Sequence, residues 1–86
     1  MRGELIMNIN ESIKVGAVFA ENNKPSPRWF VWQKRKYHIQ KITYVWRVKN
    51  GGTYLLYFAA ADNNGNVYEI SFNQKSLEWR LESVKE

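Results

Sequence analysis

The chain has 86 residues, a formal net charge of +5, one histidine and no cysteine. A chain of this length forms one domain with a small core, to which thirteen aromatic residues contribute much apolar area. The lack of cysteine excludes disulfides and thiolate metal sites. A single histidine also supplies too few ligands for a zinc site built by the protein alone, so we expect no metal and no cofactor.

No apolar run approaches the ~18–20 residues of a membrane span, and the N-terminus lacks the apolar core of a signal peptide. We therefore expect a cytoplasmic protein without a membrane partner.

Charge and aromatic residues are concentrated in one part of the chain. Residues 22–61 contain eight Lys or Arg, no Asp or Glu, and nine of the thirteen aromatic residues. The window therefore carries +8, and the remainder carries −3. Such asymmetry is typical of a protein that binds a polyanion. A basic surface that only keeps the protein soluble would give the same composition, so both interpretations stay open.

Residues 1–12 are polar and weakly patterned, which predicts a flexible N-terminal segment followed by a single β-barrel-like domain over residues 13–86. Residues 13–20 alternate apolar and other side chains, which predicts a strand. Residues 21–27 contain two prolines and two asparagines, which predicts a loop.

Four short turns divide the remaining chain, and each fixes which residues of its two flanking strands face each other. The expected turns are Lys34 with Arg35, residues 50–52, Asn64 with Gly65, and Gln74 with Lys75. These turns predict an antiparallel meander. They place one set of apolar residues on a single face of the sheet and bring Glu69 opposite Arg80. The set comprises Phe30, Trp32, Tyr37, Ile39, Ile42, Tyr44, Trp46, Val48, Leu55, Tyr57, Tyr68, Ile70, Phe72, Leu77, Trp79 and Leu81.

The alternation slips between Ile39 and Ile42, where two polar residues separate the apolar ones. A β-bulge near Gln40 and Lys41 restores the parity and bends a long strand there. Long bent strands are typical of small barrels. We therefore predict an all-β fold, a small antiparallel meander of about six strands that closes as a barrel or half-barrel.

The opposite face of the first strands is also apolar and is bordered by cations. The same register places there Trp29, Val31, His38, Thr43, Val45, Arg47, Tyr54, Leu56 and Phe58. Either an N-terminal strand covers this patch, or Trp29, Tyr54 and Phe58 are partly exposed surfaces on which bases stack. Both alternatives remain open from the residues alone.

Catalytic chemistry has no support in the sequence. No pair of carboxylates presents itself, and no serine has a histidine and an acid around it in a local motif. The glycines at positions 51, 52 and 65 read as hairpin turns and not as phosphate-binding loops before helices. We expect no enzymatic activity and no catalytic residue.

A pattern of Phe30, Trp32, the basic turn at 34–36, Tyr37, Ile39 and Trp46 resembles that of a small bacterial family of unknown function, some of whose members are encoded near translesion DNA polymerases. The likeness spans about residues 13–84. The resemblance implies a bacterial protein and a link to DNA, and it implies no catalytic residue. Its motifs are mostly core aromatics, and this chain differs in a longer loop over residues 22–27 and in lysine where the turn of the family often has glycine. The similar positions are Phe30, Val31, Trp32, the basic turn at 34–36, Tyr37, His38, Ile39, Trp46, Tyr57, Phe58, Asp62, Gly65, Tyr68, Glu69, Ile70 and Trp79.

Cations interleaved with aromatic rings suit single-stranded nucleic acid, because phosphates need charge and every base has a face that stacks. We expect non-enzymatic binding of single-stranded nucleic acid, with DNA favoured slightly over RNA. The alternative is a protein-interaction or homodimerisation module that uses the apolar patch around Trp29, Leu56 and Phe58. The predicted nucleic-acid-binding residues are Arg28, Trp29, Lys34, Arg35, Lys36, Lys41, Arg47, Lys49, Tyr54 and Phe58.

Overall fold

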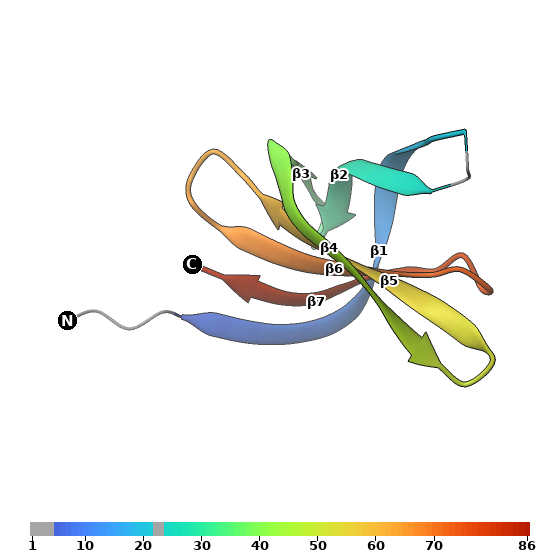
Figure 1. Cartoon of the computed structure of the whole chain (residues 1–86). Helices are drawn as coiled ribbons and strands as arrows, with labels where there is room; N and C mark the ends of the chain where they lie inside the picture. Colours follow the sequence, from blue (N-terminus) through green and yellow to red (C-terminus); the bar gives the residue numbers. More distant parts are fainter. Residues whose placement is uncertain (1–4, 22–23) are drawn as a thin grey trace.

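The computed structural model describes residues 5–21 and 24–86, which form seven β-strands and no helix (Figure 1). All neighbouring strands are antiparallel, and the order across the sheet is β3-β2-β1-β7-β6-β5-β4. The strands are β1 (Ile6–Phe19), β2 (Pro25–Trp32), β3 (Arg35–His38), β4 (Lys41–Asn50), β5 (Thr53–Ala61), β6 (Val67–Asn73) and β7 (Trp79–Lys85).

The predicted all-β antiparallel meander is confirmed, whereas the closed barrel and the count of six strands are not. The long bent strand of the prediction is two strands, β3 and β4, which meet at a corner. At this corner the Ile39 amide donates to the Arg28 carbonyl, and the Gln40 amide donates to the Ala61 carbonyl. β3 and β4 pair with each other nowhere, so they form the two edges of an open, strongly curved sheet.

β1 joins the two parts of the sheet. Its first half pairs with β7, from Ile6 to Ile13, and its second half pairs with β2, from Lys14 to Phe19. The strand therefore begins at Ile6 and not at residue 13, and residues 6–12, expected to be flexible, are ordered by their pairing with β7. Residues 1–4 of that expected segment lie outside the described residues.

β2 begins at Pro25, within the segment predicted as a loop, of which Asn22 and Asn23 lie outside the described residues. Proline lacks the amide hydrogen that a central strand needs. β3 pairs only with the Trp29–Trp32 part of β2, so the part that contains Pro25 and Pro27 has a strand on one side only. The prolines are accommodated because half of the backbone groups there need no partner strand.

The β2–β3 turn consists of Gln33 and Lys34, both with positive φ (52° and 63°), instead of the predicted Lys34 and Arg35. A two-residue hairpin turn of type I′ requires positive φ at both positions. Each residue of β2 therefore pairs with a residue two positions earlier in β3 than predicted, and Phe30 pairs with Tyr37. A shift of two residues keeps each side chain on its predicted face of the sheet.

The expected turn at residues 50–52 is confirmed, and Trp46 lies on the same face as Tyr57, with which it pairs directly. Their face is nevertheless the outer one, because a bulge that the sequence does not mark lies at Thr43. Ile42 pairs with Ala60, but Tyr44 pairs with Ala59. The extra residue turns the rest of β4 over, so the predicted core residues Tyr44, Trp46 and Val48 point outward.

The β5–β6 connection contains five residues, 62–66, and not the two-residue turn predicted at Asn64 and Gly65. The Asp62 carboxylate causes this difference, because it accepts hydrogen bonds from the amides of Asn64 (2.8 Å) and Asn66 (3.0 Å) and holds a wider loop. Phe58 therefore pairs with Ile70, and the predicted pairs of this hairpin are wrong by one residue. The shift reverses the parity a second time, which returns Ile70 to the interior.

The register of the β6–β7 hairpin moves by one pair, so Phe72 pairs with Trp79. Leu77, predicted in the core, lies in the turn with φ 65° and is exposed. The predicted pair of Glu69 with Arg80 is wrong, because the shifted register pairs Arg80 with Ser71. A bulge between Glu69 and Ile70 then pairs Glu69 with Ser83.

The core occupies the concave side of the curved sheet. One cluster of buried residues lies where β1, β2, β6 and β7 approach each other, and a second lies under β5 and β6. Trp79 packs against both clusters. The clusters are Phe30, Ala60, Tyr68, Ile70, Leu81 and Val84, and Leu56, Phe58 and Phe72.

Candidate functional site

The predicted nucleic-acid-binding residues do not form one surface. They divide between the outer face of the β1–β2–β3 part of the sheet, a groove on the concave side, and the β4–β5 hairpin. All seven predicted cations are exposed. The first two places have the geometry of binding sites.

Trp29 on β2 pairs directly with Gly16 on β1. The indole covers this glycine so closely that a Cβ atom at position 16 would lie 2.0 Å from Trp29 Cε2. Covering a strand glycine with a cross-strand aromatic ring stabilises the pair. The Lys36 ammonium lies 4.5 Å from the centroid of the same ring, which is a cation–π contact. Trp29 is therefore held in place and half-buried.

Cations surround Trp29 on this outer face. Lys14 pairs with Val31, and Val31 pairs with Lys36, so the two lysines lie in one row across three strands. Arg28 is the extra residue of a β-bulge next to Trp29, because Gly16 pairs with Trp29 while Ala17 pairs with Pro27. No Asp or Glu occurs in residues 14–19 or in β2 and β3. We call this surface the basic face; it comprises Lys14, Arg28, Trp29, Lys36 and His38, with Lys34 in the adjoining turn.

Arg35 belongs to the other side of β3, because it pairs with Trp32 and its guanidinium carbon lies 5.8 Å from the centroid of the Tyr37 ring. Lys41 lies at the start of β4. These two residues, predicted to contact phosphates with Lys36, are therefore not part of the basic face.

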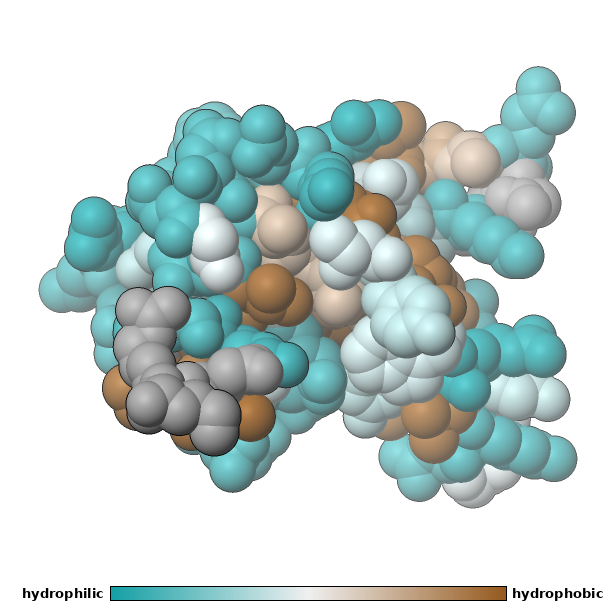
Figure 2. Space-filling view, turned by 60° about the vertical axis from the view of Figure 1, so that its left-hand side comes forward, coloured by the Kyte–Doolittle hydropathy of each residue, from teal (hydrophilic) through white to brown (hydrophobic). Residues whose placement is uncertain are grey.

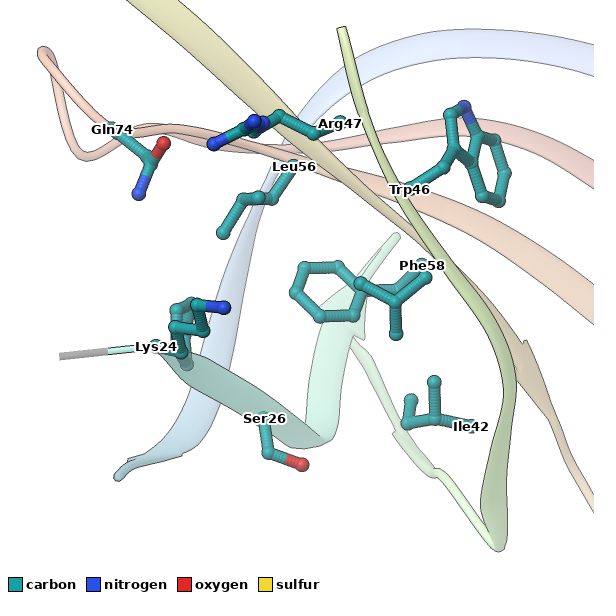
Figure 3. Close-up of a pocket in the computed structure, with 10 residues that line it drawn as sticks. Lys24, Ser26, Ile42, Trp46, Arg47, Leu56, Phe58 and Gln74 are labelled. Atoms are coloured by element: carbon teal, nitrogen blue, oxygen red, sulfur yellow. The ribbon is translucent and has the colours of Figure 1, made fainter. Parts of the chain in front are cut away.

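A groove of about 600 Å³ opens on the concave side, between the start of β2 and β4 (Figure 3). Leu56 and Phe58 form its floor. Phe58 has only 3% of its surface exposed, so it is a core residue and the prediction of an exposed stacking ring is wrong. The predicted apolar patch around Trp29, Leu56 and Phe58 is not a single surface, because Leu56 and Phe58 face the groove and Trp29 faces outward. The lining residues are Lys24, Pro25, Ser26, Ile42, Val45, Trp46, Arg47, Leu56, Phe58 and Gln74.

Positive charge borders the groove. Arg47 extends along it above Leu56, and its guanidinium carbon lies 4.4 Å from the Tyr54 ring centroid. One face of Tyr54, predicted to stack on bases, is thus covered by Arg47. Among the described residues, the lining includes no Asp or Glu. Figure 3 shows the Trp46 ring on the opposite side of β4 from the groove.

The opening is visible from outside as well. In the space-filling view of Figure 2, the surface is notched between two projecting parts on the right. The groove of Figure 3 is likewise open to solvent and is not an enclosed cavity.

The outer side of β4 carries an aromatic row that sequence reasoning assigned to the core. The Trp46 and Tyr57 rings stack with centroids 5.3 Å apart, and Tyr44 meets Trp46 edge-on at 6.2 Å. Tyr44 is 73% exposed. Burial raises the pKa of Tyr57, and the nearby carboxylates of Glu82 and Glu69 raise it further. This row therefore borders an acidic surface, which repels phosphates.

The β5–β6 loop has the densest polar network of the described residues, centred on Asp62. Its carboxylate also accepts hydrogen bonds from Asn66 Nδ2 (3.1 Å) and the Tyr68 hydroxyl (2.9 Å). Burial alone would raise the pKa of Asp62, but the hydrogen bonds outweigh it and hold the pKa below its usual value. Burial and the bond to Asp62 raise the pKa of Tyr68 to about 12. This network stabilises the loop and leaves no lone pair aimed at a ligand.

Within the described residues, no group of three or more His, Cys, Asp or Glu side chains could hold a metal ion. None of the described segments is a helix long and apolar enough to cross a membrane. No family model, curated protein or solved structure matches the chain. The resemblance to the small bacterial family therefore stays an expectation.

Proposed function

We propose that this protein binds single-stranded nucleic acid, without catalysis, through the basic face. The observation that supports this proposal is the position of Trp29, a rigidly held ring among four exposed cations on strand segments that contain no Asp or Glu, residues 14–19 and 25–38. Single-stranded nucleic acids are bound in this way elsewhere, with phosphates along cationic side chains and bases on aromatic rings.

In the bound state, one base stacks on the Trp29 indole. Lys36 now occupies that ring, 4.5 Å from its centroid, and the base displaces it to a neighbouring phosphate. Lys14, Arg28 and Lys34 contact further phosphates. Stacking contributes about 1–3 kcal/mol per base and accepts any base, so we expect little sequence preference. Because a ring can stack only on an unpaired base, single strands bind better than duplex.

The location of the acidic residues also favours binding of nucleic acid at the basic face. Glu69 and Glu82 interact on the outer side of β6 and β7, where burial and the charge of Glu82 raise the pKa of Glu69. Phosphates avoid that side. The proposed setting is the bacterial cytoplasm, with DNA slightly favoured over RNA.

The test is a fluorescence titration of the protein with oligo-dT and with a duplex of equal length, at several salt concentrations. If four cations contact phosphates, log K falls against log salt with a slope near −3, at roughly 0.7 counterion per contact. Lys36→Gln flattens this slope by about 0.7. The matched control is Lys75→Gln, which makes the same change of charge in the exposed β6–β7 turn and leaves the slope unchanged.

Trp29→Phe keeps a ring over Gly16 but reduces its area, and we expect it to weaken the part of the binding that persists at high salt. Absence of binding to any oligonucleotide at low salt would refute the proposal. Equal binding of single strands and duplex, with no salt-resistant part, would show attraction by charge alone.

A further inference from the structure

We propose that the groove between β2 and β4 binds an extended segment of a partner protein, which adds as a strand to the free edge of β4 and carries carboxylates toward Arg47 and Lys49. This site is separate from the basic face, and the inference does not rest on nucleic-acid binding.

The first observation is the state of the β4 edge. β4 has ten residues and pairs with β5 alone, so the backbone groups along its other side meet no strand among the described residues. The start of β2, across the groove, likewise pairs only with β1. An extended peptide placed between them would hydrogen-bond with backbone groups that the sheet leaves unpaired, as in other proteins that bind peptides by strand addition.

The second observation is that β4 exposes apolar side chains on both of its faces. Tyr44 and Trp46, 73% and 36% exposed, point outward, and Val45, 55% exposed, points to the groove. Proteins normally protect a long edge strand with charges, proline or a covering segment, because a bare apolar edge invites pairing. Here the edge has one bulge and three cations, and its apolar residues remain uncovered.

The groove sets the chemistry of the segment. On the inner side of β4, Val45 lies in the row of Phe58 and Arg47 lies in the row of Leu56. A segment opposite them would place an apolar side chain over Phe58 and, two residues along, a carboxylate beside Arg47. From Ile42 to Arg47 the strand runs about 17 Å at 3.4 Å per residue, so the groove takes about six residues.

Charge favours an acidic partner over a second copy of this chain. β4 carries Lys41, Arg47 and Lys49 and no acid. Two β4 strands paired edge to edge would set the same three cations close together, which destabilises cross-strand pairing. An acidic segment would instead meet opposite charge at these positions.

The probe is an end-capped, fluorescein-labelled peptide of about eight residues, a length set by the strand rise. It carries two glutamates and then two valines at every second position, with threonine between them, so that all four lie on one face. We expect saturable binding by fluorescence anisotropy. The same peptide N-methylated at every second residue, in both phases, tests the backbone contacts, and at least one phase binds about tenfold or more weakly because two or more hydrogen bonds are lost. A valine–lysine peptide does not bind.

Variants of the exposed edge keep the fold. Arg47→Gln weakens the valine–glutamate peptide about threefold to fivefold, and Val45→Asp weakens it more because it places an acid in the groove. Lys75→Gln and Lys36→Gln leave it unchanged. In hydrogen exchange, the peptide slows the amides of β4 and leaves those of β3 unaffected.

Three results would overturn the inference. One is equal binding of the peptide and both N-methylated forms. Another is concentration-dependent dimerisation that Val45→Asp abolishes, which would make a second copy the occupant. The third is competition of oligo-dT with the peptide together with weaker oligo-dT binding by Arg47→Gln, which would assign the groove to nucleic acid. Absence of oligonucleotide binding by the wild-type protein would refute only the proposal for the basic face, since the peptide titration contains no nucleic acid, so the two proposals fail separately.

Discussion

β4 and β6 are built from similar residues but have opposite surroundings. β6 has strands on both sides, and Tyr68, Ile70 and Phe72 are buried in it. β4 has a strand on one side and alternates Tyr44, Trp46 and Val48 with Val45, yet nine of its ten residues are exposed and only Ile42 is partly buried. The difference shows that the position of a strand in the sheet, and not its hydrophobicity, decides whether its aromatic residues form core or interface.

Trp79 and Trp46 differ in their surroundings in the same way. Trp79 on β7 packs against Phe72 and Phe58, with ring centroids 4.4 and 5.8 Å away. Trp46 on β4 stacks on Tyr57, meets Tyr44 edge-on and is 36% exposed. Sequence reasoning expects both to be core residues of equal weight.

Replacement of these tryptophans gives the largest expected effect. Trp79→Ala removes a ring from both core clusters and costs roughly 3–5 kcal/mol of unfolding free energy, enough to unfold so small a domain. Trp46→Ala removes two aromatic pairs on the surface and costs only about 1–2 kcal/mol. Urea denaturation followed by circular dichroism measures both. Equal losses would contradict the contrast between an interior β7 and an exposed β4.

The Asp62 loop should have the next largest effect, because it sets the register that brings β6 into the core. Asp62→Ala removes the hydrogen bonds to two amides, to Asn66 and to Tyr68, and should cost about 2–3 kcal/mol. The control is Asn64→Ala, whose exposed side chain makes no hydrogen bond that holds the loop. Similar melting temperatures for Asp62→Ala and wild type would show that the loop forms without its carboxylate.

The same network predicts how stability depends on pH. The pKa of Tyr68 is raised to about 12, so its contribution is complete below pH 10 and is lost as the pH rises from 10 toward 12. The pKa of Asp62 is lowered, so its contribution is present above about pH 4 and is lost as the pH falls further. Tyr68→Phe should flatten the alkaline loss in urea midpoints measured across this range. An unchanged alkaline profile in that variant would assign the loss to other groups.

The smallest effect is expected at the edge itself. Tyr44→Ser should change the unfolding free energy by less than about 0.5 kcal/mol, since exposed positions contribute little. If the groove binds a partner strand, the same variant should weaken the valine–glutamate peptide without loss of stability. A large loss of stability would show that Tyr44 supports the fold.

The parts of the fold that short-range chemistry controls could be predicted. Turn residues and alternation revealed the antiparallel meander, and Phe30, Ile70 and Leu81 are buried as expected. The bulge at Thr43 could not be predicted, because a bulge adds one residue without changing residue type. The wider loop at Asp62 depends on hydrogen bonds that a two-residue turn with Asn64 and Gly65 fits equally well in sequence. Each of these two errors exchanges the inner and outer faces of the sheet, so they cancel beyond β5, and the inner face of β6 was predicted correctly.

The sites were harder to predict, since they depend on which strands lie at the edges. The aromatic, basic window from residue 22 to 61 predicted one surface, but four strands separate β2 from β4 in the sheet. Arg28 and Lys36 therefore lie on the basic face, whereas Arg47 borders the groove. Lys14 was missed because it lies outside that window. Its row with Lys36 exists only through the pairing of β1 with β2.

The pairing of β1 with β7 has a consequence for how the chain acquires its structure. Every other pair of adjacent strands is a hairpin of near neighbours in sequence, whereas Ile13 pairs with Trp79 across the length of the domain. The chain therefore contains two sets of consecutive hairpins, residues 6–38 and 41–85. Only the pairing of β1 with β7 joins them, and it brings together residues far apart in sequence. Closing so long a loop is slow. During synthesis from the N-terminus, one edge of β1 has no partner strand until β7 has been made, and an unpaired strand edge is the kind of surface through which chains aggregate.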